Sequence, residues 1–231
     1  MIRWSHDGVE VAFTTRHGGV SEGPYASLNL GVATGDEPER VLENRRRAVA
    51  AIDGEVATGA MAHQVHGAAV LKPEPLGLDR LVERPRCDGL WTDEPDRTLM
   101  LVTADCLAIA LAGEGAVAVL HAGWRGLLAG IAQAGVEALG GDVHAIVGPG
   151  IGPCCYKVGD EVAGPFRERF GDDVVRGRNL DLWTAAERSL AGAASVERID
   201  LCTSCNPDRF FSHRRDRGVT GRQGVVARVA G

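Results

Sequence analysis

The sequence of 231 residues has no run of about 18 uncharged apolar residues, so no membrane-spanning helix is expected. Its start, MIRWSHDGVEVAF, is typical of a strand and lacks the basic first residues, apolar stretch and cleavage site of a signal peptide. Positive charge is also scarce: 25 Lys and Arg residues stand against 31 Asp and Glu residues, for a net charge of −6. Because nucleic-acid backbones are bound by clusters of Lys and Arg, we expect a cytoplasmic protein that binds neither nucleic acid nor membranes.

Internal repeats, low-complexity tracts and flexible linkers are absent as well. At this length, and with 45% hydrophobic residues, the chain can bury one sizeable core. Apolar runs with strand character alternate with amphipathic helical patterns. The sequence therefore predicts a single compact domain over residues 1–231 of the α/β class (α+β type), with a central mixed β-sheet flanked by helices.

Helices are expected where apolar residues recur at helical spacing, and strands where β-rich apolar runs lie between turns. The predicted helices cover about 37–51, 122–141, 159–170 and 180–194. The predicted strands lie near 9–15, 60–65, 87–93, 97–112, 115–121, 144–148, 197–202 and 221–230. Glycines and a proline exclude regular structure from the loop at 16–31, and ordered loops of this length are often functional.

The chain has six cysteines but only one CxxC pair, Cys202 and Cys205. In a reducing compartment these residues are expected to be thiols or metal ligands instead of disulfides. A zinc ribbon needs a second pair at suitable spacing, and only the adjacent Cys154 and Cys155 can supply it. Free cysteines packed near strand ends are the favoured interpretation, and a second metal site is the alternative.

Cys106 and His121 are polar residues within two apolar runs that are separated by Gly113-Glu114-Gly115. If Gly113 and Glu114 form a two-residue hairpin loop, Cys106 lies directly opposite His121, with Cβ atoms about 4.5–5.5 Å apart. A zinc ion, with bonds of about 2.3 Å to sulfur and about 2.0–2.1 Å to nitrogen, fits between two such side chains. The spacing therefore predicts a Cys/His metal site on this hairpin.

His63 and His66 of the segment HQVHG are both candidates for a third ligand, and the residues alone do not choose between them. Asp105, in the segment TADC, is the first candidate for a carboxylate that moves protons or supports a ligand. On a regular strand, however, its side chain would point to the face opposite that of the neighbouring cysteine. Asp88 and Asp93 are the alternative carboxylates.

Eight motifs follow one another along the chain: TTRHGGVS (14–21), SLNLG (27–31), QVHG (64–67), DGLWTD (88–93), TADC (103–106), HAGWRG (121–126), GPGIGPCCYKVGDEV (148–162) and SHRRDRGVTGR (212–222). In these motifs the chain resembles the laccase-domain family, also called the polyphenol oxidase or multi-copper-oxidase-like family, which includes the peptidoglycan editing factors. The resemblance extends from about residue 8 to the C-terminus. His213, where the family often has an aromatic residue, and the pair Cys202 and Cys205 depart from the family pattern.

The resemblance implies a zinc-dependent purine nucleoside phosphorylase with adenosine deaminase activity. Adenosine, inosine or methylthioadenosine would react with phosphate to give the base and ribose-1-phosphate. Carried over by motif, the zinc ligands and catalytic residues are His66, Cys106 and His121, with Asp105 as a further catalytic candidate. The resemblance thus selects His66 over His63. Three protein ligands with an open fourth position are typical of a catalytic zinc, which can make hydroxide available for deamination near neutral pH.

Phosphorolysis also needs cationic groups or backbone donors for phosphate. Arg45, on the helix after the long loop, and Arg125, close to His121, are the first candidates. Arg16, which precedes two glycines, and Asn29 of SLNLG are further candidates for binding phosphate or ribose.

Two other functions remain open at this point. One is a copper-dependent polyphenol oxidase, since a Cys with two His also binds copper in vitro. However, the seven histidines are few for a multicopper centre. The other is a non-enzymatic factor in peptidoglycan editing. In each case we expect a monomer or homodimer whose partners are small molecules.

Overall fold

The computed structural model describes residues 1–231, and its strands form two mixed sheets. The five-stranded sheet has the order β1 (Ile2–His6), β2 (Val9–Phe13), β13 (Gln223–Val229), β6 (Arg97–Thr103) and β3 (Glu55–Met61). The six-stranded sheet has the order β12 (Ser195–Arg198), β9 (His144–Val147), β7 (Leu107–Gly113), β8 (Ala116–Ala122), β5 (Gly89–Thr92) and β4 (Val70–Leu71). A further small hairpin joins β10 (Val175–Arg176) and β11 (Asn179–Leu180).

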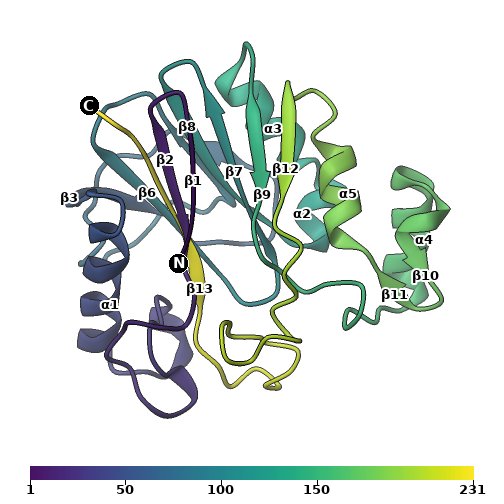
Figure 1. The fold of residues 1–231 in the computed structure, drawn as a ribbon, viewed down its shortest axis with the longest axis horizontal. Coiled ribbons are helices and arrows are strands. Elements are labelled where there is room, and N and C mark those ends of the chain that lie inside the picture. The colour runs from purple at the N-terminus through teal and green to yellow at the C-terminus, as the bar shows by residue number, and fades with distance from the viewer.

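Five α-helices cover the outer faces of these sheets: α1 (Pro38–Ala50), α2 (Trp124–Ala129), α3 (Ile131–Leu139), α4 (Asp160–Phe170) and α5 (Leu182–Ser189). Short 3-10 turns occupy Gly23–Tyr25, Val32–Thr34 and Asp172–Val174. In Figure 1, α1 lies on one side of the strands, and α4 and α5 lie on the other. None of the helices combines the length and apolar character needed to cross a membrane.

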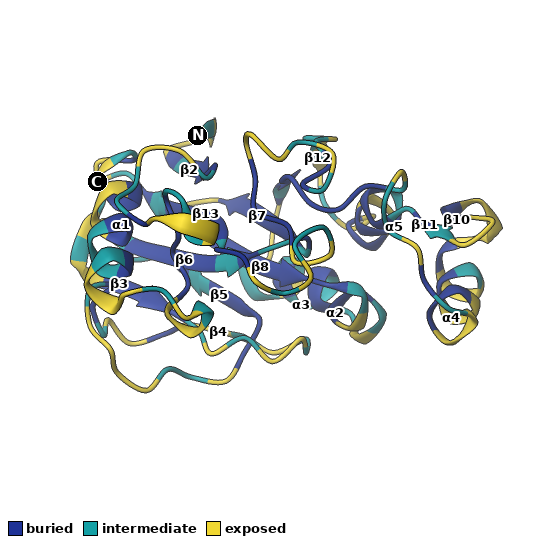
Figure 2. Cartoon of the chain, turned by 90° about the horizontal axis from the view of Figure 1, so that it is seen from below, coloured by how far each residue is buried: buried dark blue, intermediate teal, exposed yellow.

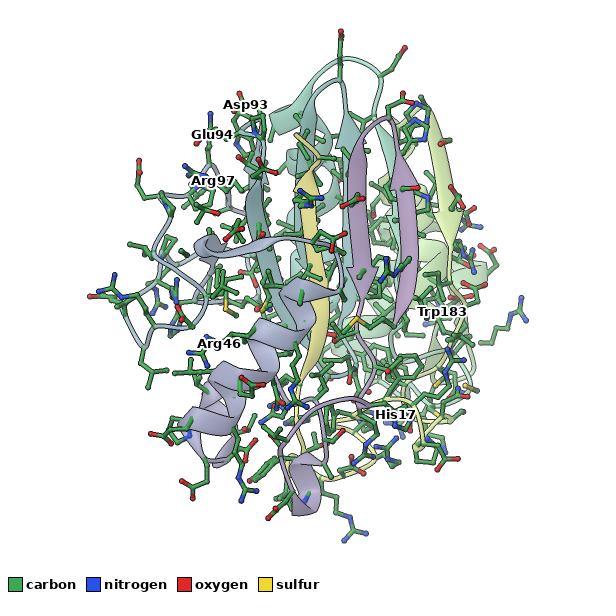
Figure 3. The ribbon with its side chains drawn as sticks, turned by 60° about the vertical axis from the view of Figure 1, so that its left-hand side comes forward. His17, Arg46, Asp93, Glu94, Arg97 and Trp183 are labelled. Atoms are coloured by element: carbon green, nitrogen blue, oxygen red, sulfur yellow. The ribbon has the colours of Figure 1, made fainter.

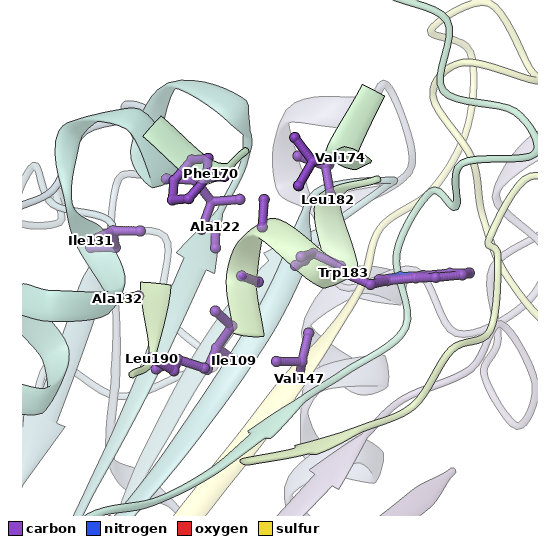
Figure 4. Packing of buried hydrophobic residues seen from close by; sticks show 14 of the residues in the cluster. Ile109, Ala122, Ile131, Ala132, Val147, Phe170, Val174, Leu182, Trp183 and Leu190 are labelled. Carbon is purple, nitrogen blue, oxygen red and sulfur yellow. The ribbon is translucent and has the colours of Figure 1, made fainter. Parts of the chain in front are cut away.

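Three apolar clusters lie between four layers: α1, the five-stranded sheet, the six-stranded sheet and the helices α2–α5. Phe13 of β2 and Leu101 of β6 pack with Ala110 of β7, so the two sheets face each other. The other face of the six-stranded sheet packs against α2–α5; Figure 4 shows residues such as Ile109 and Leu182 in this cluster. The outer face of the five-stranded sheet packs against α1. The predicted α+β class is therefore confirmed, with two mixed sheets where the sequence suggested one.

The strands β7 and β8 are buried at every position and appear dark blue along their length in Figure 2. One face contacts the second sheet and the other contacts helices, which explains why both runs are apolar throughout. Because Cys106 directly precedes β7 and His121 lies in β8, the site rests on the most buried strands of the molecule.

The predicted register of this hairpin was wrong by two residues. Gly113 pairs with Ala116, so the two-residue loop is Glu114-Gly115, and His121 lies opposite Ala108. The second loop position has φ +64°, a conformation that favours glycine, and Gly115 occupies it. Cys106 therefore precedes the paired residues of β7 and does not face His121 directly.

The helix predicted over 122–141 is also interrupted. Gly130 adopts φ +92°, ends α2 and begins α3. At the N-terminus, the turn Asp7-Gly8 has φ +44° and +79° and folds the first residues into the hairpin β1–β2 instead of one strand. The predicted helices near 37–51, 159–170 and 180–194 correspond to α1, α4 and a shorter α5.

Candidate active site

The side chains of His66, Cys106 and His121 converge from three segments of the chain. His66 lies between β3 and β4, Cys106 lies directly before β7, and His121 belongs to β8. Their ligand atoms all lie within 4.8 Å of one another, and the two imidazole rings meet edge to face with centroids 4.8 Å apart. His63 is exposed, forms a bridge with Arg86 and stands outside this group. The choice of His66, which the residues alone left open, therefore agrees with the geometry.

Asp88, directly before β5, holds two of these three residues in place. Its buried carboxylate accepts the backbone N–H groups of Val65, His66 and Gly67 at 2.7–3.0 Å. It also accepts a hydrogen bond from Nδ1 of His121 at 2.8 Å, so Nε2 is the ring nitrogen that can bind a metal. His66 has a left-handed backbone with φ +61°, a conformation that these hydrogen bonds stabilise.

Asp88 is also held in its ionised form. Burial alone would raise the pKa of the carboxyl group. However, the hydrogen bonds from His121 and from the backbone N–H groups lower it below its ordinary value. An ionised carboxylate behind a histidine fixes the ring orientation and raises its basicity, as is typical of metal-binding histidines.

Gly123 provides the space in which the three side chains meet. A Cβ atom at this position would lie 2.9 Å from Sγ of Cys106 and 3.4 Å from Cδ2 of His66. Any larger residue would therefore displace the sulfur or the imidazole. The glycine of HAGWRG thus keeps the ligand atoms close together.

Cys106 and His121 form a charged pair. Burial would raise the pKa of the thiol, but the charges and hydrogen bonds of His121 and His66 lower it to about 6. Burial likewise opposes protonation of His121, yet the thiolate and Asp88 raise its pKa to about 9. At neutral pH the thiol is therefore ionised, which is the form that binds a metal.

We expect iodoacetamide to modify Cys106 of the metal-free protein with a rate that rises through about pH 6, because the thiolate exists above its pKa. An ordinary cysteine reacts half-maximally near pH 8.5, its unperturbed pKa. The rate can be followed by peptide mass spectrometry across this pH range. In a His121→Ala variant the midpoint should move upward, and an identical profile in the two proteins would contradict the assigned cause.

Both carboxylate oxygens of Asp105 form hydrogen bonds outside the group of His66, Cys106 and His121. The chain between β6 and β7 leaves the strand, and Asp105 takes φ +88°. One carboxylate oxygen accepts a hydrogen bond from the Thr203 hydroxyl at 2.6 Å, and the other accepts the backbone N–H of Arg214 at 2.7 Å. Asp105 thus joins the site to the C-terminal segment, and Asp88 occupies the supporting position that the sequence analysis gave only as an alternative.

Asp93, the other alternative carboxylate, lies at the periphery beside Glu94 and Arg97 (Figure 3). It pairs with Lys72 and is half exposed. The pair Asp88 and Asp93 therefore offers a matched test, with one carboxylate behind a ligand and one on the surface.

We expect Asp88→Asn to weaken metal binding by about 10–100-fold, the usual cost of losing the outer partner of a ligand. The amide keeps one acceptor oxygen but loses the charge that orients His121. Competition with a chromophoric chelator measures the affinity, and Asp93→Asn is the control that should leave it unchanged. Equal affinities in the two variants would contradict the role of Asp88.

A cavity of about 710 Å³ opens beside the three ligands. Its lining contains six arginines and only two carboxylates, Glu83 and Asp105. The arginines are Arg45, Arg80, Arg84, Arg125, Arg214 and Arg222. None of the six forms an ion pair with a carboxylate, although other arginines of the chain do. The cavity is therefore strongly cationic in a protein whose net charge is −6.

Arg45 is the most buried of these arginines, with 4% of its surface exposed. It donates to the carbonyl oxygens of Leu30 and Leu78, and burial together with the charge of Arg84 lowers its pKa to about 10. The guanidinium is still protonated at neutral pH. A buried cation without a carboxylate partner favours an anionic ligand, because the anion supplies the missing charge.

Arg84 and Arg222 are cavity residues that the sequence analysis missed. Nη1 of Arg84 is buried and has no hydrogen-bond partner in the protein. Burial is the main cause of the lowered pKa of both residues. Arg84 lies between β4 and β5, in a part of the sequence where no periodic pattern indicated a functional residue.

Two of the four predicted phosphate residues lie outside the cavity. Arg16 donates to the carbonyl oxygens of Ala26 and Pro207 and stacks on a phenylalanine ring, which ties two loops together. Asn29 is buried, and its side-chain oxygen accepts the backbone N–H of Arg222 at 2.8 Å. Both support the loops around the cavity, whereas Arg45 and Arg125 line it.

Two aromatic rings, those of Trp124 and Tyr156, also line the cavity. The guanidinium of Arg125 lies over Trp124 at 4.4 Å, and that of Arg214 lies over Tyr156 at 5.1 Å. All four residues line the cavity. It therefore combines flat apolar surfaces with cationic groups next to the His/Cys cluster.

A family model described as "Multi-copper polyphenol oxidoreductase laccase" matches residues 10–230, and the chain belongs to this family. The resemblance stated from the sequence motifs is thereby confirmed. The purine nucleoside phosphorylase YlmD of Geobacillus stearothermophilus is 36% identical, covering 93% of this chain and 88% of the relative. The purine nucleoside phosphorylase of Deinococcus radiodurans is 39% identical, covering 98% and 91%. The crystal structure of YlmD from G. stearothermophilus has a TM-score of 0.90 at 36% identity, covering 97% of this chain and 93% of that chain.

Proposed function

We propose that the protein is a purine nucleoside phosphorylase that acts on adenosine, inosine or methylthioadenosine. The observation that carries the proposal is a cavity directly beside His66, Cys106 and His121 whose six arginines form no ion pair with a carboxylate. Phosphate provides the anion that such a cavity favours, and a purine fits against its aromatic wall. The relatives named purine nucleoside phosphorylases support the same reaction.

Zinc is the metal that we propose for the three side chains. Two imidazoles and a thiolate suit zinc, and the ligand atoms lie within 4.8 Å of one another with a carboxylate behind His121. When bound by these three residues, zinc would supply a Lewis acid beside the cavity. The same donors also accept copper, so weak oxidation of phenols by copper-loaded protein is compatible with this site.

In phosphorolysis, an oxygen of phosphate forms a bond to the anomeric carbon while the bond from that carbon to the purine nitrogen breaks. The purine leaves with a proton, and ribose-1-phosphate remains. We assign phosphate binding to Arg45 with Arg84, and to Arg125, all three of which line the cavity. Asp88 and Asp105 are positioning residues, since the first orients His121 and the second holds the backbone of Arg214.

Deamination of adenosine is the second activity that we propose for the same cavity, with water replacing the amino group and ammonia leaving. We also retain a cytoplasmic location and a monomeric or homodimeric state as predictions.

Chromatography of adenosine incubated with zinc-loaded protein tests the proposal. Adenine and ribose-1-phosphate that form only with phosphate, and disappear when the metal is chelated, are the expected result. Inosine formed without phosphate would indicate deamination. If no purine nucleoside reacts, while copper-loaded protein oxidises phenols, the phosphorylase proposal fails and the oxidase alternative stands. A protein inert in every assay would favour the non-enzymatic role.

A further inference from the structure

Four cysteines outside the candidate active site converge on one another. They come from two loops far apart in the sequence, Cys154 and Cys155 after β9 and Cys202 and Cys205 after β12. Their sulfur atoms all lie within 4.8 Å of one another. The sulfur of Cys205 is 3.3 Å from that of Cys154 and also 3.3 Å from that of Cys155.

We propose that these four cysteines form a second metal site, which binds a structural zinc ion as a tetrathiolate. With zinc–sulfur bonds of about 2.3 Å, the sulfurs of a tetrahedral site lie about 3.8 Å apart. Two of the observed separations are 3.3 Å and none exceeds 4.8 Å, so only small side-chain shifts are needed to reach this value. Four protein ligands leave no open position, which is the arrangement of a structural site.

Backbone hydrogen bonds hold the two cysteine-bearing loops together. Cys202 forms an isolated bridge with Gly150, and the amide N–H of Thr203 donates to the Gly150 carbonyl oxygen at 3.0 Å. The amide N–H of Gly152 donates to the sulfur of Cys202 at 3.2 Å. Hydrogen bonds of this kind orient a metal-bound ligand and are part of its outer shell.

A disulfide accounts less well for the arrangement. It would join two of the sulfurs and leave the other two unused, while Cys154 and Cys155 stand at the same distance from Cys205. The geometry thus selects no single pair. Soft thiolate donors in a group of four favour zinc over the hard cations that prefer oxygen.

The proposed site would connect the loops that form one wall of the cavity. Ile151 and Tyr156 flank the first cysteine pair and line the cavity. Thr203, next to Cys202, donates its hydroxyl to Asp105. Metal bound by the four cysteines would therefore hold this wall in place. The proposal is independent of the reaction that the cavity performs.

Metal analysis of the purified full-length chain provides the test, in a Cys106→Ala background that removes the other thiolate site. We expect one equivalent of zinc to remain in this variant and to be lost when Cys205→Ser is added. The exposed Cys154→Ser should have the same effect, and Cys87→Ala, outside both clusters, should not. Retention of zinc in both serine variants, or its absence from Cys106→Ala, would overturn the proposal.

Cobalt substitution gives a second readout that needs no cysteine replacement in the cluster. Cobalt-loaded Cys106→Ala should show the thiolate-to-metal charge-transfer band and the intense visible absorption of tetrahedral sulfur coordination. The unfolding temperature of metal-free Cys106→Ala should rise when zinc is added. An intact mass showing an oxidised cysteine pair, together with no cobalt absorption, would establish a disulfide and refute the metal site.

Discussion

Replacing Cys106 by alanine is expected to abolish turnover of purine nucleosides and to remove one equivalent of metal. Cys106 offers the only thiolate among the three converging side chains, and its low pKa keeps it ionised at neutral pH. Loss of an outer partner alone costs about 10–100-fold in metal affinity, so loss of a ligand should cost at least as much. Metal content and product formation, measured on the same preparation, check this result.

The control for this variant is Cys87→Ala. Cys87 is fully buried between the sheets and belongs neither to the His66, Cys106 and His121 group nor to the group of four cysteines. We expect it to keep its metal and its turnover, with a modest loss of stability. Undiminished turnover in Cys106→Ala, with the fold intact by circular dichroism, would show that the reaction does not depend on the thiolate.

Replacing Arg45 by alanine is expected to raise the KM for phosphate about 10–100-fold. A hydrogen bond to a charged group contributes about 1.5–3 kcal/mol, and about 1.4 kcal/mol corresponds to a tenfold change in binding. The KM for the nucleoside should change far less, because the nucleoside carries no charge for this guanidinium to neutralise. Steady-state kinetics with phosphate and nucleoside varied separately measure both values.

Two variants on the same helix sharpen this prediction. Arg45→Lys keeps the charge but loses part of the fixed pair of hydrogen bonds to Leu30 and Leu78, so we expect an intermediate KM. Arg47→Ala removes an exposed arginine that pairs with Glu43 and should leave both KM values unchanged. Equal effects of Arg45→Ala on the two substrates would indicate a structural role instead.

The layered fold could be predicted from hydrophobic pattern, because strands buried on both faces are apolar throughout. The hairpin register could not, since two glycines flank Glu114 and only the left-handed backbone at Gly115 decides which pair forms the loop. Likewise, the helical pattern continues across Gly130, and nothing in its periodicity indicates the break. Local backbone geometry at glycine, which composition does not reveal, caused both errors.

For the site, the motifs indicated the three converging residues His66, Cys106 and His121, but the supporting contacts depend on tertiary structure. Asp88 is 22 residues from His66 and 33 from His121 in sequence, so its hydrogen bonds to both depend on the pairing of β5 with β4 on one side and with β8 on the other. In the sequence, nothing distinguishes Arg84 from an arginine on the surface. Its role depends on burial without a partner, which is a property of the folded molecule.

The carboxylate of Asp88 has a consequence for the energetics of the whole protein. It accepts hydrogen bonds from four donors on two segments without a metal, so His66 and His121 are ordered in advance and binding of the proposed metal need not supply that order. The three side chains belong to segments that separate on unfolding, so we expect the proposed metal to bind the native state alone. Stability would then vary with free metal concentration, by about 2.7 kcal/mol when that concentration is a hundred times the Kd. We therefore expect the abundance of the folded protein to follow the metal supply.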